Sequence, residues 1–140
     1  MPLDIGSLEK SVAALRAAVA KSEDGEFMRG LDEVARNTMR SGVIQHFEFT
    51  YELCWKFMKR WLETNVSPAI ADGVTRRELF RLAAESLLIG DIERWMRHHD
   101  ARNVSSHTYD LAVAGSVYQA AREFVPDAQR VLDALKARND

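Results

Sequence analysis

Residues 101–110, ARNVSSHTYD, carry side chains that could act together on a phosphate. Arg102 offers a planar, permanently charged guanidinium that fits phosphate oxygens, and His107 can exchange a proton near neutral pH. Such a pair suits metal-free cleavage of an RNA backbone. The histidine would deprotonate the 2′-hydroxyl or protonate the leaving oxygen, and the arginine would stabilise the charge that develops on phosphorus. One chain supplies one such histidine, so an acid and base pair would need two chains.

The spacing of these residues constrains how they could meet. In an ideal helix, side chains five residues apart point about 140° from each other, so Arg102 and His107 share one phosphate only if the arginine curls back or the last turn distorts. Asn103 lies a full turn before His107 and is expected to hold its ring by a hydrogen bond. Ser106, the neighbour of His107, is the other candidate supporting residue.

The helix that would carry this group begins as an apolar line and continues as a polar one. Ile92 and Met96 lie four residues apart, and the same line continues through His99, Asn103 and His107. Burying Asn or His without a partner costs roughly 1 to 3 kcal/mol per group. A surface strip is one interpretation, but a polar-lined cavity or a subunit interface explains the line better.

The remaining sequence shows helical periodicity almost throughout. Thr75 and Glu78 form a capping box for a third helix that Gly90 should stop, and Asp91 should cap the fourth. Pro126 should kink or split the last helix. The expected helices span about residues 8–19, 41–64, 76–88, 92–106 and 113–135. We therefore expect an all-α fold, an antiparallel four- or five-helix up-and-down bundle, in one domain over residues 1–140.

The expected helix over residues 41–64 is apolar over much of its circumference, so a bundle or a second subunit should cover several sides. Its polar strip has acids N-terminal to bases at four-residue spacing and predicts a solvated face: Glu48, Glu52, Lys56 and Arg60. A second apolar line is expected to be buried: Phe49, Leu53, Phe57 and Trp61.

Composition excludes several classes of protein. A chain with 46% hydrophobic and 29% charged residues is typical of a soluble globular domain. No apolar run approaches the roughly 20 residues of a membrane span, and no signal peptide is evident, so a cytoplasmic location is expected without a membrane partner. Cys54, the single cysteine, is expected in the core. No metal site or cofactor is expected, because the adjacent His98, His99 and Asp100 point about 100° apart and no glycine-rich phosphate loop is present.

Two segments resemble the nucleotidyltransferase substrate-binding protein family, a branch of the HEPN superfamily. Residues 41–63, SGVIQHFEFTYELCWKFMKRWLE, are similar to the long second helix of the family, and ARNVSSHTYD is similar to its RN…SHTY signature. The order of helices fits as well, so the resemblance covers nearly the whole chain. Residues 25–40 fit less well and look like an extended approach to the second helix, in which Phe27, Leu31 and Val34 repeat the helical spacing.

The resemblance implies a HEPN-like helical bundle that forms homodimers, with the motifs of two chains facing one cleft, and a minimal nucleotidyltransferase as partner. In related toxins the arginine and histidine, here Arg102 and His107, serve metal-independent ribonuclease activity. Asn103 matches a supporting polar residue, and Tyr109 matches the tyrosine that partner enzymes modify with AMP. Two interpretations stay open: a ribonuclease toxin acting on RNA, and a non-catalytic nucleotide-binding accessory subunit of the nucleotidyltransferase.

Overall fold

A computed structural model describes residues 2–139 of the chain, and no strand occurs among them. The elements, in order, are α1 (Gly6–Glu23), α2 (Gly25–Arg29), α3 (Glu33–Asn65), α4 (Arg76–Glu85), α5 (Ile92–Val104), a 3₁₀ turn η1 (Ser105–His107) and α6 (Leu111–Ala137). The predicted all-α class is confirmed.

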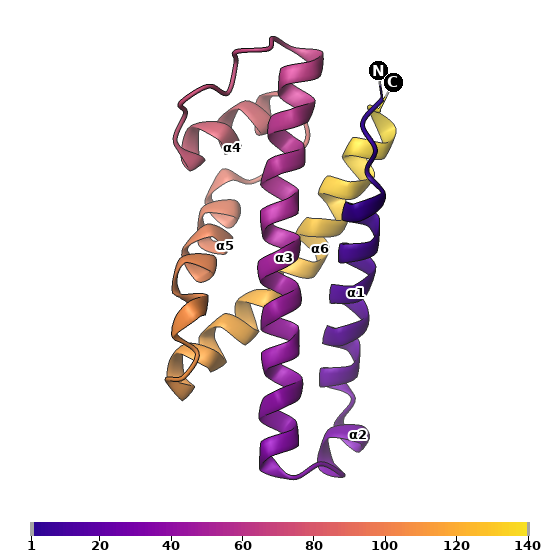
Figure 1. Ribbon diagram of the computed structural model, residues 1–140, viewed down its shortest axis with the longest axis vertical. Helices are drawn as coiled ribbons and strands as arrows, with labels where there is room; N and C mark the ends of the chain where they lie inside the picture. Colours follow the sequence, from indigo (N-terminus) through magenta and orange to yellow (C-terminus); the bar gives the residue numbers. More distant parts are fainter. Residues whose placement is uncertain (1, 140) are drawn as a thin grey trace.

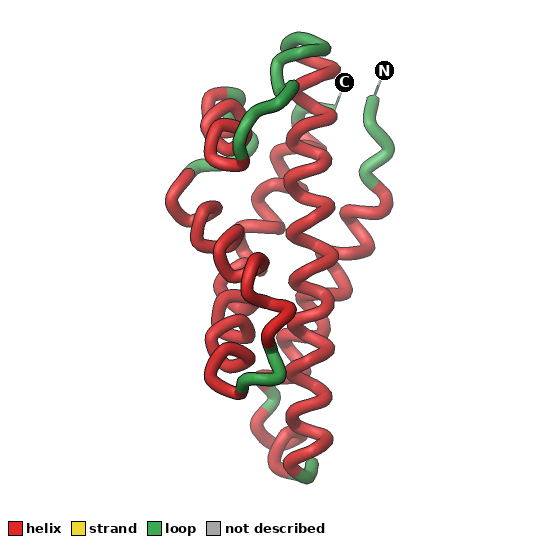
Figure 2. Tube along the Cα trace, turned by 60° about the vertical axis from the view of Figure 1, so that its left-hand side comes forward, coloured by secondary structure: helices red, strands yellow, loops and turns green. Residues whose placement is uncertain are grey.

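The long helix α3 forms the centre of the molecule. Helix α1 lies along one side of it, α6 crosses behind it, and α4 and α5 lie on the other side (Figure 1). Helices α1, α3, α5 and α6 alternate in direction, as expected of an up-and-down bundle. The two ends of the chain meet, because Asn139 accepts a hydrogen bond from the Leu3 N–H at 2.7 Å and donates one to the Leu3 carbonyl at 2.9 Å. Figure 2 shows that most connecting loops are short and that a longer one joins α3 to α4 at the upper end of the molecule.

The core forms where the apolar faces of α1, α3, α4 and α6 meet. Leu8 and Leu15 of α1, Phe47 of α3, Phe80 of α4 and Phe124 of α6 are all fully buried. The ring of Phe124 packs edge-to-face on Phe47, with centroids 5.2 Å apart. No helix within residues 2–139 is long and apolar enough to cross a membrane.

Local capping signals set the starts of α4 and α5. The Thr75 hydroxyl accepts a hydrogen bond from the Glu78 N–H at 3.1 Å. The Asp91 carboxylate accepts from the N–H groups of Glu93 and Arg94 at 2.9 and 3.2 Å. Both predicted helix starts are therefore confirmed. They can be predicted from the sequence because a capping side chain and the N–H groups that donate to it lie within three or four residues of each other.

The predicted end of α4 at Gly90 is wrong. The helix ends at Glu85, and Leu87 takes a left-handed conformation with φ 63°. The Leu87 N–H bonds the Ala84 carbonyl at 3.0 Å and the Leu88 N–H bonds the Ala83 carbonyl at 2.9 Å. This is the hydrogen-bond pattern of a Schellman motif, with leucine where glycine is usual.

Three further parts of the chain can be compared with what the sequence predicts. Residues 25–40 are mostly helical, because Asp24 caps α2 through the Phe27 N–H and Asp32 caps α3 through the Ala35 N–H, so α3 begins at Glu33. Helix α6 runs unbroken through Pro126, which is exposed, so the expected split of the helix does not occur. Phe49, expected on a buried line of α3, is 55% exposed, because the helices of one chain leave that side of α3 uncovered.

Candidate functional site

The residues of α5 that face the core each precede by one position a residue of the line predicted through Met96, His99 and Asn103. Trp95, His98 and Ser105 are buried, and Arg102 lies half-buried between them, whereas Met96 is only partly buried. Helix α5 therefore packs through a line that includes a histidine, an arginine and a serine. Each of these polar groups has a partner on another helix, which removes most of the cost of burying it.

Arg102 is held by two carboxylates of α3. Its Nη1 group donates to Oε2 of Glu48 at 3.2 Å and to Oγ of Ser105 at 3.1 Å. Its Nε lies 3.2 Å from Oε1 of Glu52, an ion pair without hydrogen-bond geometry. The Nη2 group has no hydrogen bond or ion pair within residues 2–139. The guanidinium is thus held at Nη1 and lies beside a carboxylate at Nε, while its Nη2 group forms no hydrogen bond with the described residues.

Ser105 closes this network. Its Oγ lies 2.6 Å from Oε2 of Glu48 and 2.8 Å from the Arg102 carbonyl. A hydroxyl has one proton, and the shorter, charge-assisted bond to the carboxylate is the stronger one, so Ser105 donates to Glu48 and accepts from Arg102. Ser106, the serine named from the sequence, is exposed and its side chain forms no hydrogen bond in the described part of the chain.

The predicted solvated strip of α3 is wrong in its first half. The side chains of Glu48 and Glu52 are 25% and 34% exposed and both contact Arg102. Lys56 and Arg60 are exposed, as expected. Four-residue spacing correctly placed all four side chains along one strip of the helix, but it could not reveal that α5 packs over half of that strip.

Asn103 holds His99 and not His107. The Asn103 amide donates to Nε2 of His99 at 3.3 Å, and Nδ1 of the same ring lies 2.8 Å from the Tyr51 hydroxyl. The expected bond from Asn103 to His107 does not form, because the α-helix ends at Val104 and the chain continues as a 3₁₀ turn. Burial, aided by the nearby positive charge of Arg76, lowers the pKa of His99, so this ring is neutral at neutral pH.

His107 lies on η1 with its side chain exposed. Its Nδ1 is 3.4 Å from the Tyr109 hydroxyl, and the two rings meet edge-to-face at 5.9 Å. Tyr109 is 84% exposed. No hydrogen bond or ion pair joins Arg102 to His107 in residues 2–139. One chain therefore fixes the arginine but does not bring the histidine into contact with it.

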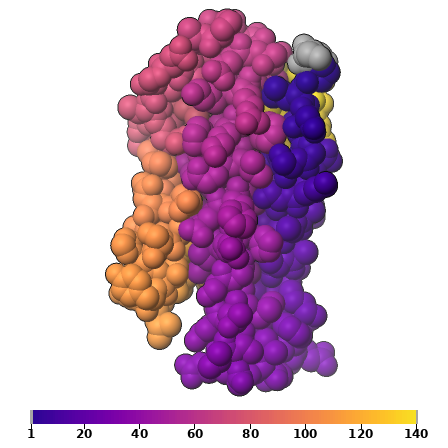
Figure 3. Space-filling model, in the orientation of Figure 1, coloured from indigo at the N-terminus to yellow at the C-terminus, as the bar shows by residue number. Residues whose placement is uncertain are grey.

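A pocket of about 440 Å³ opens beside this turn. Its walls come from the first part of α3 and the first part of α6, and the chain between His107 and Tyr109 contributes Thr108. Figure 3 shows the notch between the lower part of α3 and the orange segment that leads into α6. The polar lining residues are Glu33, Asn37, Arg40, Ser41, Thr108, Tyr118 and Gln119.

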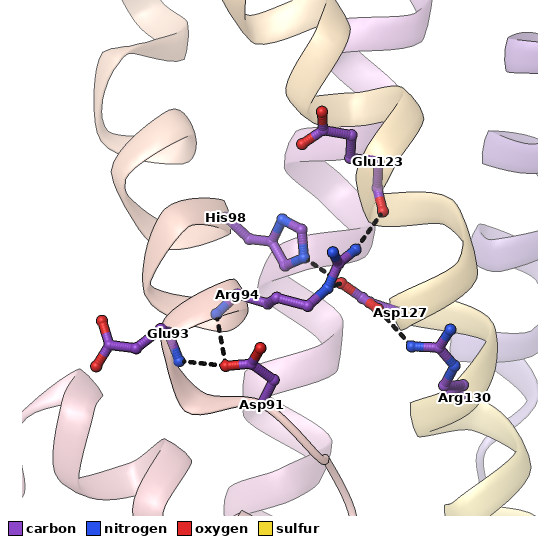
Figure 4. A network of polar contacts seen from close by, with 7 residues as sticks. All are labelled: Asp91, Glu93, Arg94, His98, Glu123, Asp127 and Arg130. Carbon is purple, nitrogen blue, oxygen red and sulfur yellow. Dashed lines mark hydrogen bonds and ion pairs between the residues drawn. The ribbon is translucent and has the colours of Figure 1, made fainter.

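A second polar cluster joins α5 to α6 (Figure 4). Nε2 of His98 donates to Oδ2 of Asp127 at 2.6 Å, Nε of Arg94 donates to the same oxygen at 2.9 Å, and Arg130 donates to Oδ1 at 2.9 Å. Burial alone would raise the pKa of Asp127, but the hydrogen bonds from His98 and Arg94 hold it below its ordinary value. This cluster fixes α5 on α6 and so positions Arg102 on the next turn.

The sequence carried a signal for this cluster. Asp127 follows Phe124 by three residues and precedes Val131 by four, so a carboxylate stands inside the apolar line of α6. A buried acid needs a cationic or hydrogen-bonding partner, and His98 and Arg94 were the candidates on the facing helix.

The remaining candidate sites are structural. Cys54 is fully buried, as expected of a core residue, and burial raises the pKa of its thiol. Within the described residues, no three His, Cys, Asp or Glu side chains gather as they would around a metal ion.

The chain matches the family described as "Nucleotidyltransferase substrate binding protein like" over residues 3–137. The chain belongs to this family. The resemblance seen in residues 41–63 and 101–110 is thereby confirmed. A family relative from Haemophilus influenzae described as "Probable ribonuclease HepT" is 33% identical over 140 residues, which cover 98% of this chain and 94% of the relative.

Two solved structures have the same fold as this chain. The protein HI0074 from Haemophilus influenzae, described as a substrate binding domain of a nucleotidyltransferase, is 30% identical with a TM-score of 0.91. The match covers 95% of this chain and 99% of that one. A protein from Thermus thermophilus is 25% identical with a TM-score of 0.72, over 91% of this chain and 98% of that one.

Proposed function

We propose that this protein is the RNA-binding component of a two-component module with a minimal nucleotidyltransferase, and that it is a metal-independent endoribonuclease of the HEPN type. The observation that carries the proposal is the state of Arg102. Two carboxylates and a buried serine contact Nη1 and Nε of the guanidinium, and its Nη2 group forms no hydrogen bond within residues 2–139. A cation fixed in this way is pre-organised for a phosphate oxygen. The relative described as a probable ribonuclease supports the same activity.

The proposed reaction is transfer of the RNA phosphate to the neighbouring 2′-hydroxyl. The 2′-oxygen forms a bond to phosphorus, the bond from phosphorus to the 5′-oxygen breaks, and the products are a 2′,3′-cyclic phosphate and a 5′-hydroxyl. His107 takes the 2′-hydroxyl proton or gives a proton to the leaving oxygen, and the second transfer needs another group. The Nη2 group of Arg102 stabilises the charge on the phosphoryl oxygens in the transition state.

The test is to incubate the purified chain with total RNA in EDTA. We expect cleavage by the wild type and a loss of about 100-fold or more in Arg102→Ala, since removing one aligned donor costs about that factor. Equal cleavage by both proteins would indicate a contaminating nuclease and would contradict the proposal. An inactive wild type would contradict the ribonuclease function directly.

The reaction also implies a homodimer, in which His107 of each chain could supply one proton transfer. Phe49, Val104 and Leu111 are large apolar side chains exposed in one chain, and Phe49 directly follows Glu48, the partner of Arg102. Burying such residues between two chains is favourable. Light scattering at micromolar concentration should therefore give about twice the monomer mass of 15.9 kDa. A monomer mass at every concentration would refute the two-chain site.

Tyr109 is the proposed site of modification by the partner enzyme. Its hydroxyl is exposed enough to accept AMP and lies beside His107. Each added phosphate brings negative charge and bulk to the site, where it would repel RNA. Co-expression with a partner nucleotidyltransferase should raise the intact mass by one or more AMP units, and Tyr109→Phe should prevent this. A modified Tyr109→Phe chain would place the acceptor elsewhere.

The second candidate function is a non-catalytic accessory subunit that binds a nucleotide. The pocket of about 440 Å³ beside Thr108 favours it, because its volume and mixed polar lining suit a nucleotide. The description of HI0074 as a substrate binding domain supports the same function. Tight binding of a mononucleotide by a wild-type chain that cannot cleave RNA would favour this function over the first.

A further inference from the structure

Arg76, the first residue of α4, lies on the same side of the molecule as Arg102 and is connected to it through two side chains. Its guanidinium carbon is 3.6 Å from the centroid of the Trp55 ring. Trp55 donates from Nε1 to Oε2 of Glu52 at 3.0 Å, and the other oxygen of Glu52 pairs with Arg102. The two arginines are therefore held by neighbouring parts of one network.

The positive charge of Arg76 is not neutralised. Within residues 2–139 it forms no ion pair or hydrogen bond, and its Nε is buried without a partner. Its neighbour Arg77, by contrast, pairs with Glu93 at 2.5 Å on the exposed side of α4. A guanidinium stacked on an indole is oriented without being neutralised, so it keeps its donors for an outside anion.

Arg76 also lies near the polar side chains of α5. Its charge contributes to the lowered pKa of His99 and acts on Tyr51, on which the charge of Arg102 acts as well. His99 is bound to Asn103, whose exposed amide follows Arg102 directly. The charges of Arg76 and Arg102 thus both act on Tyr51, which is bonded to His99, and His99 is bonded to Asn103.

We propose that Arg76 and Asn103 form a second phosphate subsite for an RNA strand, adjacent to the one at Arg102. The strand then runs along α5 from η1 toward the start of α4. The phosphate at Arg102 is the one that reacts, and the phosphate at Arg76 only positions the strand. The charge of Arg76 is available to hold a phosphate, because Arg76 has no ion pair within residues 2–139, whereas Arg102 shares its charge with Glu48 and Glu52. The inference rests on the proposed binding of RNA at Arg102.

The test is the affinity of the full-length protein for a short single-stranded RNA made uncleavable by 2′-O-methyl groups, measured by anisotropy at several salt concentrations. Arg76→Met keeps an apolar stem over Trp55 and removes the charge. We expect Arg76→Met to weaken RNA binding about 5- to 20-fold. The slope of log affinity against log salt concentration should also become shallower by about one. Arg77→Met is the matched control, because it removes an adjacent exposed arginine, and it should change affinity by less than about twofold.

A second arm uses AMP, which has one phosphate and cannot occupy both subsites. AMP bound at Arg102 should lose affinity in Arg102→Ala and keep it in Arg76→Met. Circular dichroism and thermal melting of Arg76→Met should match the wild type. If they do not, Arg76→Lys, which keeps the charge without the stacked fork, should still bind the RNA more tightly than Arg76→Met.

The outcomes separate the two hypotheses. RNA binding that depends on Arg102 but is equal in Arg76→Met and Arg77→Met overturns the second subsite and leaves the proposed function standing. RNA binding that falls equally in Arg76→Met and Arg77→Met also overturns it, because it indicates attraction by general positive charge. A wild type without affinity for the RNA overturns both.

Discussion

Replacing His107 with alanine should lower the rate of RNA cleavage by about 100- to 10,000-fold at neutral pH, the range that one general acid or base contributes. RNA affinity should change by less than about threefold, because the exposed ring contacts only Tyr109 within the described chain and neutralises no charge. Single-turnover cleavage with excess protein measures the chemical step, and anisotropy with uncleavable RNA measures binding.

Arg97→Ala is the control for this experiment. Arg97 lies on α5, is exposed, and forms no side-chain hydrogen bond within residues 2–139. Its loss should leave the cleavage rate within about twofold, since a single exposed charge contributes little. A His107→Ala protein that cleaves at the wild-type rate would remove His107 from the chemistry. A parallel loss of affinity and rate would make it a binding residue.

Glu48 and Ser105 fix the position of Arg102, and neither was predicted as a functional residue. Both contact Nη1 of the guanidinium, and neither contacts Nη2. A free arginine side chain loses rotational freedom when it binds a phosphate, at a cost of about 0.5 to 1.5 kcal/mol. In the folded chain Arg102 is already restrained, because the Glu48 carboxylate and the Ser105 hydroxyl bond Nη1. The packing that places these two residues would therefore lower the entropic cost of the proposed phosphate binding.

The elements that could be predicted from the sequence depend on local contacts. Thr75 and Asp91 were identified as caps because the backbone N–H groups that donate to them lie within three residues. The end of α4 was predicted incorrectly because Leu87 takes a conformation that residue type alone disfavours. Only the tertiary position of the buried Leu88 makes that turn favourable.

The candidate site residues come from a motif, and the partners of these residues come from distant helices that the motif does not reveal. Arg102, His107 and Tyr109 were proposed from the order of residues in ARNVSSHTYD. The buried line of α5 was predicted one residue too far along the chain, because it was defined from the apolar pair Ile92 and Met96 alone. Its true members include His98 and Arg102, whose partners lie on α6 and α3. The carboxylate inside the apolar line of α6 was the one sequence feature that pointed to such a pairing.

Replacing Asp127 with alanine should lower the free energy of unfolding by about 3 to 5 kcal/mol, the usual effect of removing one partner of a buried ion pair. The substitution would leave His98 buried without its acceptor and Arg94 without its ion pair. Urea unfolding at pH 7 measures the loss. Asp133→Ala is the matched control, because Asp133 is an exposed carboxylate on the same helix, and it should cost less than about 1 kcal/mol.

Asp127→Asn separates the charge from the shape of this side chain. Its amide oxygen can still accept a hydrogen bond, so the loss at pH 7 should be smaller, about 1 to 2 kcal/mol. Because the pKa of Asp127 is held below its ordinary value, the ionised carboxylate stabilises the fold fully above about pH 4, the unfolded value, and this stabilisation disappears as pH falls through the folded pKa. The difference in unfolding free energy between wild type and Asp127→Asn should therefore be constant near neutral pH and shrink below about pH 4. If the difference between wild type and Asp127→Asn stays constant to about pH 3, the ionised carboxylate does not hold α5 on α6. A loss of stability in Asp133→Ala as large as in Asp127→Ala would lead to the same conclusion.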